Sequence, residues 1–206
     1  MPNNKWNIIN PNFRWMSTFD APLLPKPIAE RKPQSKTTLD PITLNMMTLR
    51  DLELRQAYME SGYNPNAVSS ANAQGLFQIG EDAHKDYLDA TGDVGDLFDP
   101  VYNKRVRDWF IQRLWNSDTI KKNNPSEEVR LAKMLAAYNW GQGNLGDYLM
   151  DLKRKGIDIY SNNDWVKGLP EETRDYVNYI MNHQPTRGKN DDDFAKQNYK
   201  YDELFK

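Results

Sequence analysis

The chain has 206 residues, of which 38% are hydrophobic and 27% charged, and its formal net charge is -2 at pH 7. This length allows one domain of good size with additional segments, but not two full domains. The charge balance lacks the basic excess with which nucleic-acid-binding proteins neutralise phosphates, so nucleic acid is not an expected partner.

The scarce residue types exclude several kinds of site. The chain has no cysteine, which rules out disulfides, thiolate nucleophiles and cysteine-ligated metals. Its two histidines, His84 and His183, stand far apart, so neither a zinc site nor a Ser–His–Asp triad is expected. We therefore expect no cofactor. No stretch reaches the ~18 consecutive apolar residues of a membrane-spanning helix, and residues 1–10 lack the apolar run of a signal peptide, so we expect neither membrane insertion nor a secretory signal.

Composition divides the chain into three segments. Seven of the twelve prolines fall within residues 1–47, which also carry a local charge of +3, and this predicts an extended N-terminal arm. Residues 48–183 are predicted to form the single folded domain. Residues 184–206 are predicted to be a polar tail that keeps enough aromatic side chains to dock.

The periodicity of the central region is helical, and strand signals are almost absent. The first predicted helix begins at residues 48–51, whose sequence Thr-Leu-Arg-Asp has the form of a capping box, and it ends before Gly62. Apolar stripes with helical spacing follow Pro100 and Pro125. We therefore predict a mainly α fold.

Later segments extend the same pattern. One more apolar stripe covers residues 145–152. The last helix opens at Pro170, and its apolar stripe, which includes Tyr176, is predicted to face inward. Gly141-x-Gly143-x-x-Gly146 has the spelling of a dinucleotide-binding loop, but it follows a segment of helical periodicity and not a strand. We therefore interpret these glycines as the end of one helix and the start of the next.

Glu60 stands at the end of the first predicted helix. Unpaired carbonyl groups give a helix C-terminus partial negative charge, so the pKa of Glu60 is expected to be raised. Residues 61–65 predict a chain reversal that folds the polar stretch 66–79 back across the helix end. Glu60 is thus a candidate general acid, although a glutamate in the last turn of a helix is usually exposed.

Two stretches carry a more specific pattern. Residues 60–79 read ESGYNPNAVSSANAQGLFQI, and residues 136–145 read AAYNWGQGNL. They resemble the motifs of the soluble lytic transglycosylases, Glu-Ser-x-aromatic-x-Pro-x-Ala-x-Ser followed by Ala-x-Gly-Leu-x-Gln-(Ile/Leu), and later Ala-Tyr-Asn-x-Gly. Residues 169–177, LPEETRDYV, also resemble the closing helix of that family. The resemblance covers about residues 48 to 183 and implies a lysozyme-like helical domain of the goose type, with a short irregular or β-like segment beside the cleft.

The resemblance also implies roles for single residues. Glu60 would be the sole catalytic acid and base, and Ser69 and Gln78 would form hydrogen bonds with the sugar at the cleavage point. Tyr138 would lie close to Glu60, with Asn139 at the wall of the cleft.

Two aromatic residues depart from the family pattern. Phe77 stands where the family often has Met, and Trp140 where it often has Ala. Each is expected either to stack on a sugar face, as a substrate-binding residue, or to pack in the core. Neither change affects a group that transfers protons.

The implied reaction is cleavage of the β-1,4 bond between N-acetylmuramic acid and N-acetylglucosamine in peptidoglycan, with 1,6-anhydromuramic ends as products. One alternative is a hydrolytic muramidase on the same scaffold, in which Asp82 or Asp86 activates water; both are expected on the solvated face of a short helix. The other alternative is a non-catalytic virion or cell-wall-binding protein, against which the intact motifs argue.

A wall-degrading enzyme without a signal peptide needs another route to its polymer. The hypothesis is that a bacteriophage encodes the protein, which is carried in the virion or released at lysis. Residues 1–47 would then attach it to virion proteins.

Overall fold

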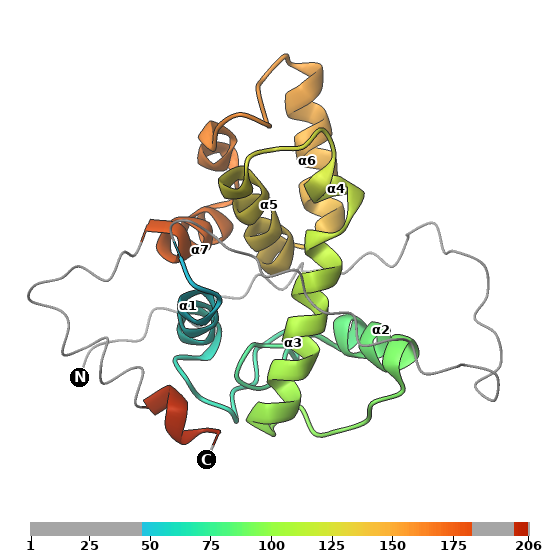
Figure 1. Cartoon of the computed structure of the whole chain (residues 1–206), viewed down its shortest axis with the longest axis vertical. Coiled ribbons are helices and arrows are strands. Elements are labelled where there is room, and N and C mark those ends of the chain that lie inside the picture. The colour runs from blue at the N-terminus through green and yellow to red at the C-terminus, as the bar shows by residue number, and fades with distance from the viewer. Residues whose placement is uncertain (1–46, 183–199, 206) are drawn as a thin grey trace, which may run out of the picture.

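The computed structural model describes residues 47–182 and 200–205, and this part of the chain is mainly helical (Figure 1). Its helices in chain order are α1 (Leu49–Ser61), α2 (Glu81–Thr91), α3 (Pro100–Trp115), α4 (Asp118–Lys121), α5 (Glu127–Trp140), α6 (Gln142–Arg154), the 3₁₀-helix η2 (Asp164–Gly168) and α7 (Glu171–Asn182). The mainly α prediction is confirmed. The helix α7 begins at Glu171, one residue later than predicted. The Pro170 carbonyl accepts a hydrogen bond from the Arg174 amide, as the residue just before a helix does.

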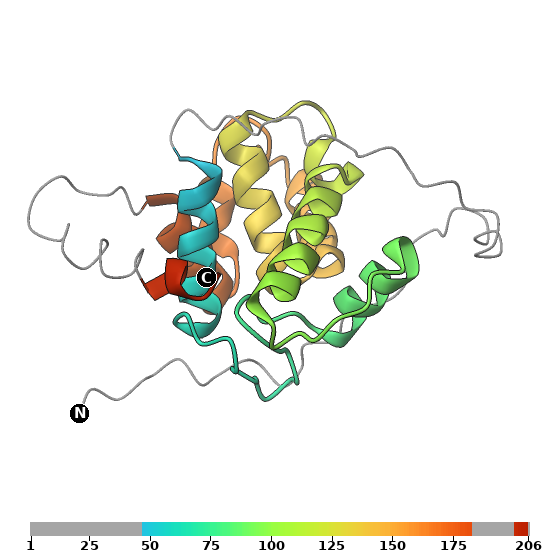
Figure 2. The same ribbon diagram turned by 60° about the horizontal axis from the view of Figure 1, so that its bottom comes forward.

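The helix α5 is the centre of the fold. It contacts α3, α4, α6 and α7, and it lies between them in both ribbon views (Figures 1 and 2). Its sequence is apolar on nearly every face, which is typical of a helix buried on all sides. Every residue from Leu131 to Tyr138 is buried. The helix therefore provides the surface against which α3, α4, α6 and α7 pack.

The helix α1 has a defined start and a defined end. Thr48 Oγ1 accepts a hydrogen bond from the Asp51 amide at 3.0 Å, and the Asp51 carboxylate accepts one from the Thr48 amide at 3.1 Å, so the predicted capping box is present. At the other end Gly62 adopts a left-handed conformation with φ of 59° and donates to Tyr58 O at 2.9 Å. The helix packs against α7, and its last turn is only partly covered: Tyr58 is exposed, whereas residues 59–61 are half-buried.

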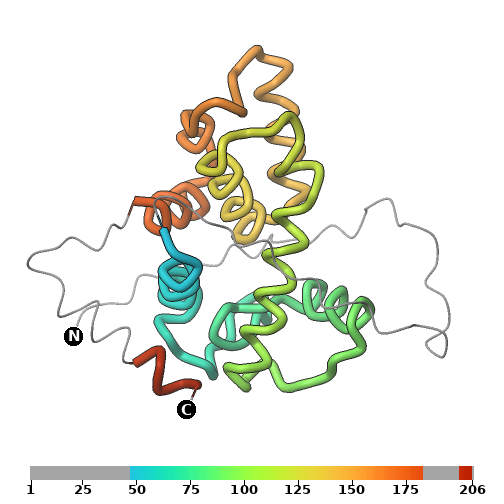
Figure 3. Tube along the Cα trace, in the orientation of Figure 1, coloured from blue at the N-terminus to red at the C-terminus, as the bar shows by residue number. Residues whose placement is uncertain are grey.

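Residues 63–80 connect α1 to α2 without a helix or a regular strand. Isolated antiparallel bridges pair Val68 with Gln74 and Gln74 with Ile79. The tube in Figure 3 shows this connection passing the N-terminal end of α3, and the turned view in Figure 2 shows the same arrangement. The predicted short irregular or β-like segment is therefore present.

Asn103, in the first turn of α3, fixes the shape of this segment. Its Oδ1 accepts from the Phe77 amide at 2.8 Å, and its Nδ2 donates to Gln74 O at 3.0 Å and to Leu97 O at 2.8 Å. Gly75, with φ of 80°, lies so close that a Cβ there would be 2.1 Å from Leu97 O. The segment thus needs both a glycine at position 75 and the amide of Asn103.

Residues 200–205 lie against α1. Tyr201 is only 1% exposed, its ring packs edge-on against Tyr63, and Arg50 forms an ion pair with Asp202. Phe205 packs on the Tyr201 ring with centroids 4.9 Å apart. Docking of the predicted tail is thus confirmed for its last aromatic residues.

The remaining sequence predictions concern the two terminal segments, the glycine motif and membrane insertion. Residues 1–46 and most of 184–206 lie outside the described residues, so the extended arm over 1–47 and the boundaries of the domain and of the tail stay predictions. Gly141 ends α5 and precedes α6, as the interpretation of the glycine motif requires. Within residues 47–182 and 200–205, no helix combines the length and the apolar character that crossing a membrane demands.

Candidate active site

Glu60 lies in the last turn of α1, where the helix meets the irregular segment. The residue as a whole is half-buried, but its Oε1 atom is covered and has no hydrogen-bond partner among the described residues. Buried polar atoms in proteins normally have a partner. Glu60 Oε1 is one of five buried side-chain atoms that lack a partner among the described residues, and it is the only carboxylate oxygen of the five.

The surroundings of Glu60 favour its neutral form. The pKa of Glu60 is raised to about 8, and burial is the largest cause. The charge of Glu172 acts in the same direction, while a hydrogen bond with Tyr176 and the charge of Arg107 oppose the rise. The direction agrees with the sequence-based expectation, but the main cause is burial and not the helix end. At neutral pH the carboxyl group holds its proton and can donate it.

Two tyrosine hydroxyls accompany Glu60. Tyr138 is buried on α5 and donates to the backbone oxygen of Phe77 at 2.9 Å. Tyr176 is buried on α7, and its hydrogen bonding with Glu60 lowers the pKa of that carboxyl group. Burial raises the pKa of both phenols well above the ordinary value, and the Glu60 charge raises it further. Both therefore remain neutral hydrogen-bond donors. The expected proximity of Tyr138 and Glu60 agrees with this electrostatic interaction.

The irregular segment is attached directly to the last turn of α1. Ser61 Oγ donates to Leu76 O at 2.8 Å, and Tyr138 holds the next residue through the Phe77 carbonyl group. These bonds place the segment 74–78 beside the Glu60 carboxyl group, between α1 and α5.

Ser69 and Gln78 lie on this segment and are half-buried. Ser69 Oγ accepts from the Ala73 amide at 2.9 Å, which leaves its proton for another acceptor. Gln78 Nε2 donates to Ala67 O at 3.1 Å and to Gly75 O at 2.9 Å. Because both amide protons are used within the segment, a ligand can bind this side chain only through its amide oxygen.

The aromatic residues near the motifs have different environments. Phe77 is 0% exposed and the Arg107 guanidinium lies 5.2 Å from its ring centroid, so its ring belongs to the core. This corrects the assignment of Phe77 as a substrate-binding residue: a fully covered ring offers no face for stacking. Trp140 is half-buried and packs edge-on against Tyr148, and Asn139 is half-buried in the last turn of α5.

The two aspartates proposed as water activators are exposed on α2. Asp86 forms an ion pair with Arg113 of α3, and neither Asp82 nor Asp86 is among the charges that shift the pKa of Glu60. They lie on the solvated face of a short helix, as expected. The carboxylate whose charge does reach Glu60 is Glu172 at the start of α7.

Tyr176 and Glu172, which act on the pKa of Glu60, were not predicted as site residues from the sequence. Both belong to the stretch 169–177 that resembles the family's closing helix, and the position of Tyr176 in the apolar stripe predicted only that it faces inward. Among the described residues, no group of three histidine, aspartate or glutamate side chains is arranged to hold a metal ion.

Comparison with known proteins adds one finding. The family model described as the Transglycosylase SLT domain matches residues 53–161, which is more than half of the chain and includes Glu60 and the irregular segment. No curated protein matches the chain.

Proposed function

Because the chain belongs to the Transglycosylase SLT domain family, we propose that it is a lytic transglycosylase whose single catalytic acid and base is Glu60. Family membership supports a peptidoglycan-cleaving activity of the lytic transglycosylase type, and it agrees with the predicted lysozyme-like helical domain. The choice of Glu60 and the course of the reaction are the finer parts of this proposal.

One observation carries the proposal: the Glu60 carboxyl group is buried with an unpaired oxygen, and burial raises its pKa to about 8. A neutral carboxyl group can protonate the glycosidic oxygen between N-acetylmuramic acid and N-acetylglucosamine. That proton transfer allows the C1–O bond to break through an oxocarbenium-like state. The 2-acetamido group of the muramic residue supports the developing cation.

The second half of the reaction uses the same group as a base. The ionised Glu60 takes the proton of the muramic C6 hydroxyl, whose oxygen attacks C1 and closes a 1,6-anhydro ring. The proton that Glu60 donated stays on the released N-acetylglucosamine hydroxyl, the C6 hydroxyl proton restores neutral Glu60, and no water is consumed. A pKa near the working pH suits a group that must both give and take a proton. The hydrogen bond from Tyr176 supports the ionised form between the two steps.

Substrate contacts are proposed on the irregular segment and at the end of α5. Ser69 can donate its hydroxyl proton and Gln78 can accept at its amide oxygen, and both lie on the segment that Ser61 attaches to the last turn of α1. The half-buried Asn139 is proposed at the wall of the same site. Phe77 contributes through its backbone oxygen, which anchors Tyr138.

The reaction is tested by digestion of purified peptidoglycan and mass spectrometry of the soluble muropeptides. We expect anhydromuropeptides from the wild type and none from Glu60→Gln, which keeps the size of the side chain but has no carboxyl proton. Products with reducing ends, heavier by one water, would instead identify a hydrolytic muramidase. Unchanged activity in Glu60→Gln would exclude Glu60, and no product from the wild type would favour a non-catalytic wall-binding protein.

Delivery of the protein to the wall is a separate proposal. Attachment to virion proteins through residues 1–47 concerns a segment outside the described residues, so it depends on the sequence analysis alone. Mass spectrometry of purified phage particles tests it, with the protein expected among the virion components. Its absence from the particles would favour an enzyme released at lysis or a bacterial protein exported by an atypical route.

A further inference from the structure

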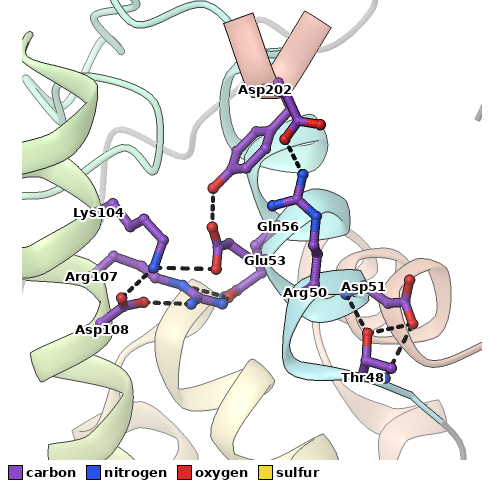
Figure 4. A network of polar contacts seen from close by, with 10 residues as sticks. Thr48, Arg50, Asp51, Glu53, Gln56, Lys104, Arg107, Asp108 and Asp202 are labelled. Carbon is purple, nitrogen blue, oxygen red and sulfur yellow. Dashed lines mark hydrogen bonds and ion pairs between the residues drawn. The ribbon is translucent and has the colours of Figure 1, made fainter. Parts of the chain in front are cut away.

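Behind Glu60 lies a chain of buried polar groups that begins on α3. Arg107 is 5% exposed and donates to Oε1 of Gln56 through Nε, at 3.0 Å, and through Nη2 (Figure 4). Gln56 is 0% exposed and lies on α1, one turn before Glu60. The remaining nitrogen of the guanidinium, Nη1, donates to Asp108 at 2.7 Å. Two nitrogens of the Arg107 guanidinium group thus donate to the same oxygen of the buried Gln56 amide.

This contact fixes the orientation of the Gln56 amide. A guanidinium group has only donors, so the oxygen of the amide must face Arg107 and its nitrogen must face the opposite way. Gln56 Nε2 lies 3.1 Å from the Tyr176 hydroxyl oxygen and donates to it. The amide therefore presents a donor, and not an acceptor, to Tyr176.

The orientation of the amide decides where the Tyr176 proton goes. A phenol hydroxyl has one proton, and its oxygen already accepts from Gln56. The acceptor available on the other side is the Glu60 carboxyl group, since hydrogen bonding between the two side chains raises the pKa of Tyr176 and lowers that of Glu60. Burial holds the pKa of Tyr176 well above its usual range, so the proton stays on the hydroxyl and is available to the carboxyl group.

We propose that Gln56 and Arg107 are positioning residues that aim the Tyr176 hydroxyl proton at the Glu60 carboxylate. The inference rests on the proposed role of Glu60 as acid and base. The oriented hydroxyl matters in the second half of the reaction, when Glu60 is ionised and buried until it takes the C6 hydroxyl proton. A donor that is already oriented stabilises that carboxylate without reorganisation.

The charged and titratable groups that face Glu60 come from three helices. Tyr176 and Glu172 lie on α7, Arg107 on α3 and Tyr138 on α5. Arg107 and Tyr176 lower the pKa of Glu60, while Glu172 raises it. A substitution at Gln56 changes the direction of the Tyr176 hydroxyl proton and so its effect on the pKa of Glu60, while Glu172, Arg107 and Tyr138 are unchanged.

The discriminating variant is Gln56→Glu, because a carboxylate at position 56 still accepts from Arg107 but has no proton to donate to Tyr176. The Tyr176 proton then turns toward the new carboxylate, so ionised Glu60 loses its donor and gains a negative neighbour. Cleavage requires protonated Glu60, so the alkaline limb of the rate-against-pH profile reports its pKa. We expect this limb to move upward by about 1 pH unit.

The matched control is Gln112→Glu, which makes the same change of charge on the half-buried face of α3. Initial rates of muropeptide release are measured for the wild type and both variants, and thermal unfolding verifies that each is folded. We expect the control to keep the wild-type profile. A Gln56→Glu profile that coincides with the wild type, while Glu60→Gln remains inactive, would overturn the inference and leave the proposed function intact.

A second pair of variants tests the Arg107 end of the chain. Arg107→Met removes both donors to Gln56, so the amide loses its fixed orientation and the alkaline limb should move in the same direction. Arg107→Lys keeps one donor and the positive charge, so its profile should lie between those of Arg107→Met and the wild type. Equal profiles for Arg107→Met and the wild type would contradict a positioning role.

A direct titration separates this inference from the activity. The Glu60 carboxyl carbon is observed by ¹³C NMR and assigned through its disappearance in Glu60→Gln. We expect its pKa to be higher in Gln56→Glu than in the wild type, whether or not peptidoglycan is cleaved. Equal titration curves would refute the positioning role even if the enzyme is active.

Discussion

Two glutamates on the same helix have contrasting environments. Glu53 and Glu60 are seven residues apart, which places them two turns apart on one face of α1. Glu53 Oε2 lies 3.2 Å from Lys104 Nζ, and its Oε1 accepts from the Tyr201 hydroxyl (Figure 4). Glu60, in contrast, has an oxygen without a partner. The residue type and the helix face are the same, so the partners supplied by other segments determine what each carboxyl group does.

The partners of the two groups come from different parts of the chain. Glu53 is paired by α3 and by residues 200–205, which together make it part of the packing between three segments. The Glu60 carboxyl group interacts with the hydroxyl groups of Tyr138 on α5 and Tyr176 on α7. The charges of Glu172 and Arg107 shift its pKa in opposite directions. A paired carboxylate stabilises the fold, whereas an unpaired one is available for chemistry.

The largest expected effect is the loss of activity on neutralising Glu60. Glu60→Gln should reduce the rate of peptidoglycan cleavage by about 10³-fold, since general acid–base groups contribute of that order. Glu53→Gln is the matched control and should stay within about threefold of the wild type, because it changes only a contact remote from proton transfer. Turbidity clearance by equal amounts of folded protein measures both. Comparable losses in the two variants would remove the distinction between the two glutamates.

The second effect concerns stability as a function of pH. The pKa of Glu60 is raised by folding, so the unfolded chain releases this proton near pH 4.5 and the folded chain near pH 8. Stability of the wild type is therefore lost between these values as the pH rises, and at pH 7 the loss is on the order of 3 kcal/mol. Glu60→Gln lacks this proton and should not show the loss.

Urea unfolding of both proteins at several pH values measures this effect. The difference in unfolding free energy between Glu60→Gln and the wild type should grow in favour of the variant from pH 5 to pH 8. A difference that stays constant over this range would mean that Glu60 is not held neutral by the fold.

The third effect tests the pairing of Glu53. Lys104→Met removes the cation that Glu53 shares with Asp108 and leaves both carboxylates partly buried. We expect a loss of about 1–2 kcal/mol in unfolding free energy, which is less than for a fully buried pair because Lys104 is 31% exposed. The double variant Lys104→Met/Glu53→Gln should recover part of this loss. Strict additivity of the two changes would show that the ion pair contributes nothing.

The smallest effect comes from the other partner of Glu53. Tyr201→Phe keeps the ring that packs against Tyr63 but removes the hydroxyl that donates to Glu53. We expect a loss of about 1 kcal/mol, the usual contribution of such a hydrogen bond. Thermal unfolding measures it, and the rate of cleavage should be unchanged. A loss of activity in this variant would mean that residues 200–205 influence the site.

The sequence predicted those parts of the site that depend on local patterns. The Thr48 and Asp51 capping box and the position of Glu60 in the last turn of α1 follow from short-range rules of helix formation. The irregular segment was predicted from the composition of residues 66–79 and from the motif. These features need no knowledge of which helices are neighbours.

The partners of Glu60 could not be predicted in this way. Arginine and glutamine are rarely buried, so helical periodicity gives no reason to place Arg107 and Gln56 in the interior. They are buried because each satisfies the other across α1 and α3. Tyr176 was expected to face inward, but its contact with Glu60 depends on the packing of α7 against α1. For Phe77 the sequence left stacking on a sugar and packing in the core both open, because proximity to a motif in sequence does not determine exposure; the ring is fully buried.

The Asn103 amide also has a consequence for the order of folding. It satisfies backbone groups of the irregular segment, yet it belongs to a helix that begins more than twenty residues later. The capping box of α1 closes within four residues and can form early, whereas the segment beside Glu60 must wait for α3. During refolding, the Phe77 amide should therefore gain protection from hydrogen exchange together with α3 and later than α1. The catalytic geometry would then be among the last parts of the domain to assemble.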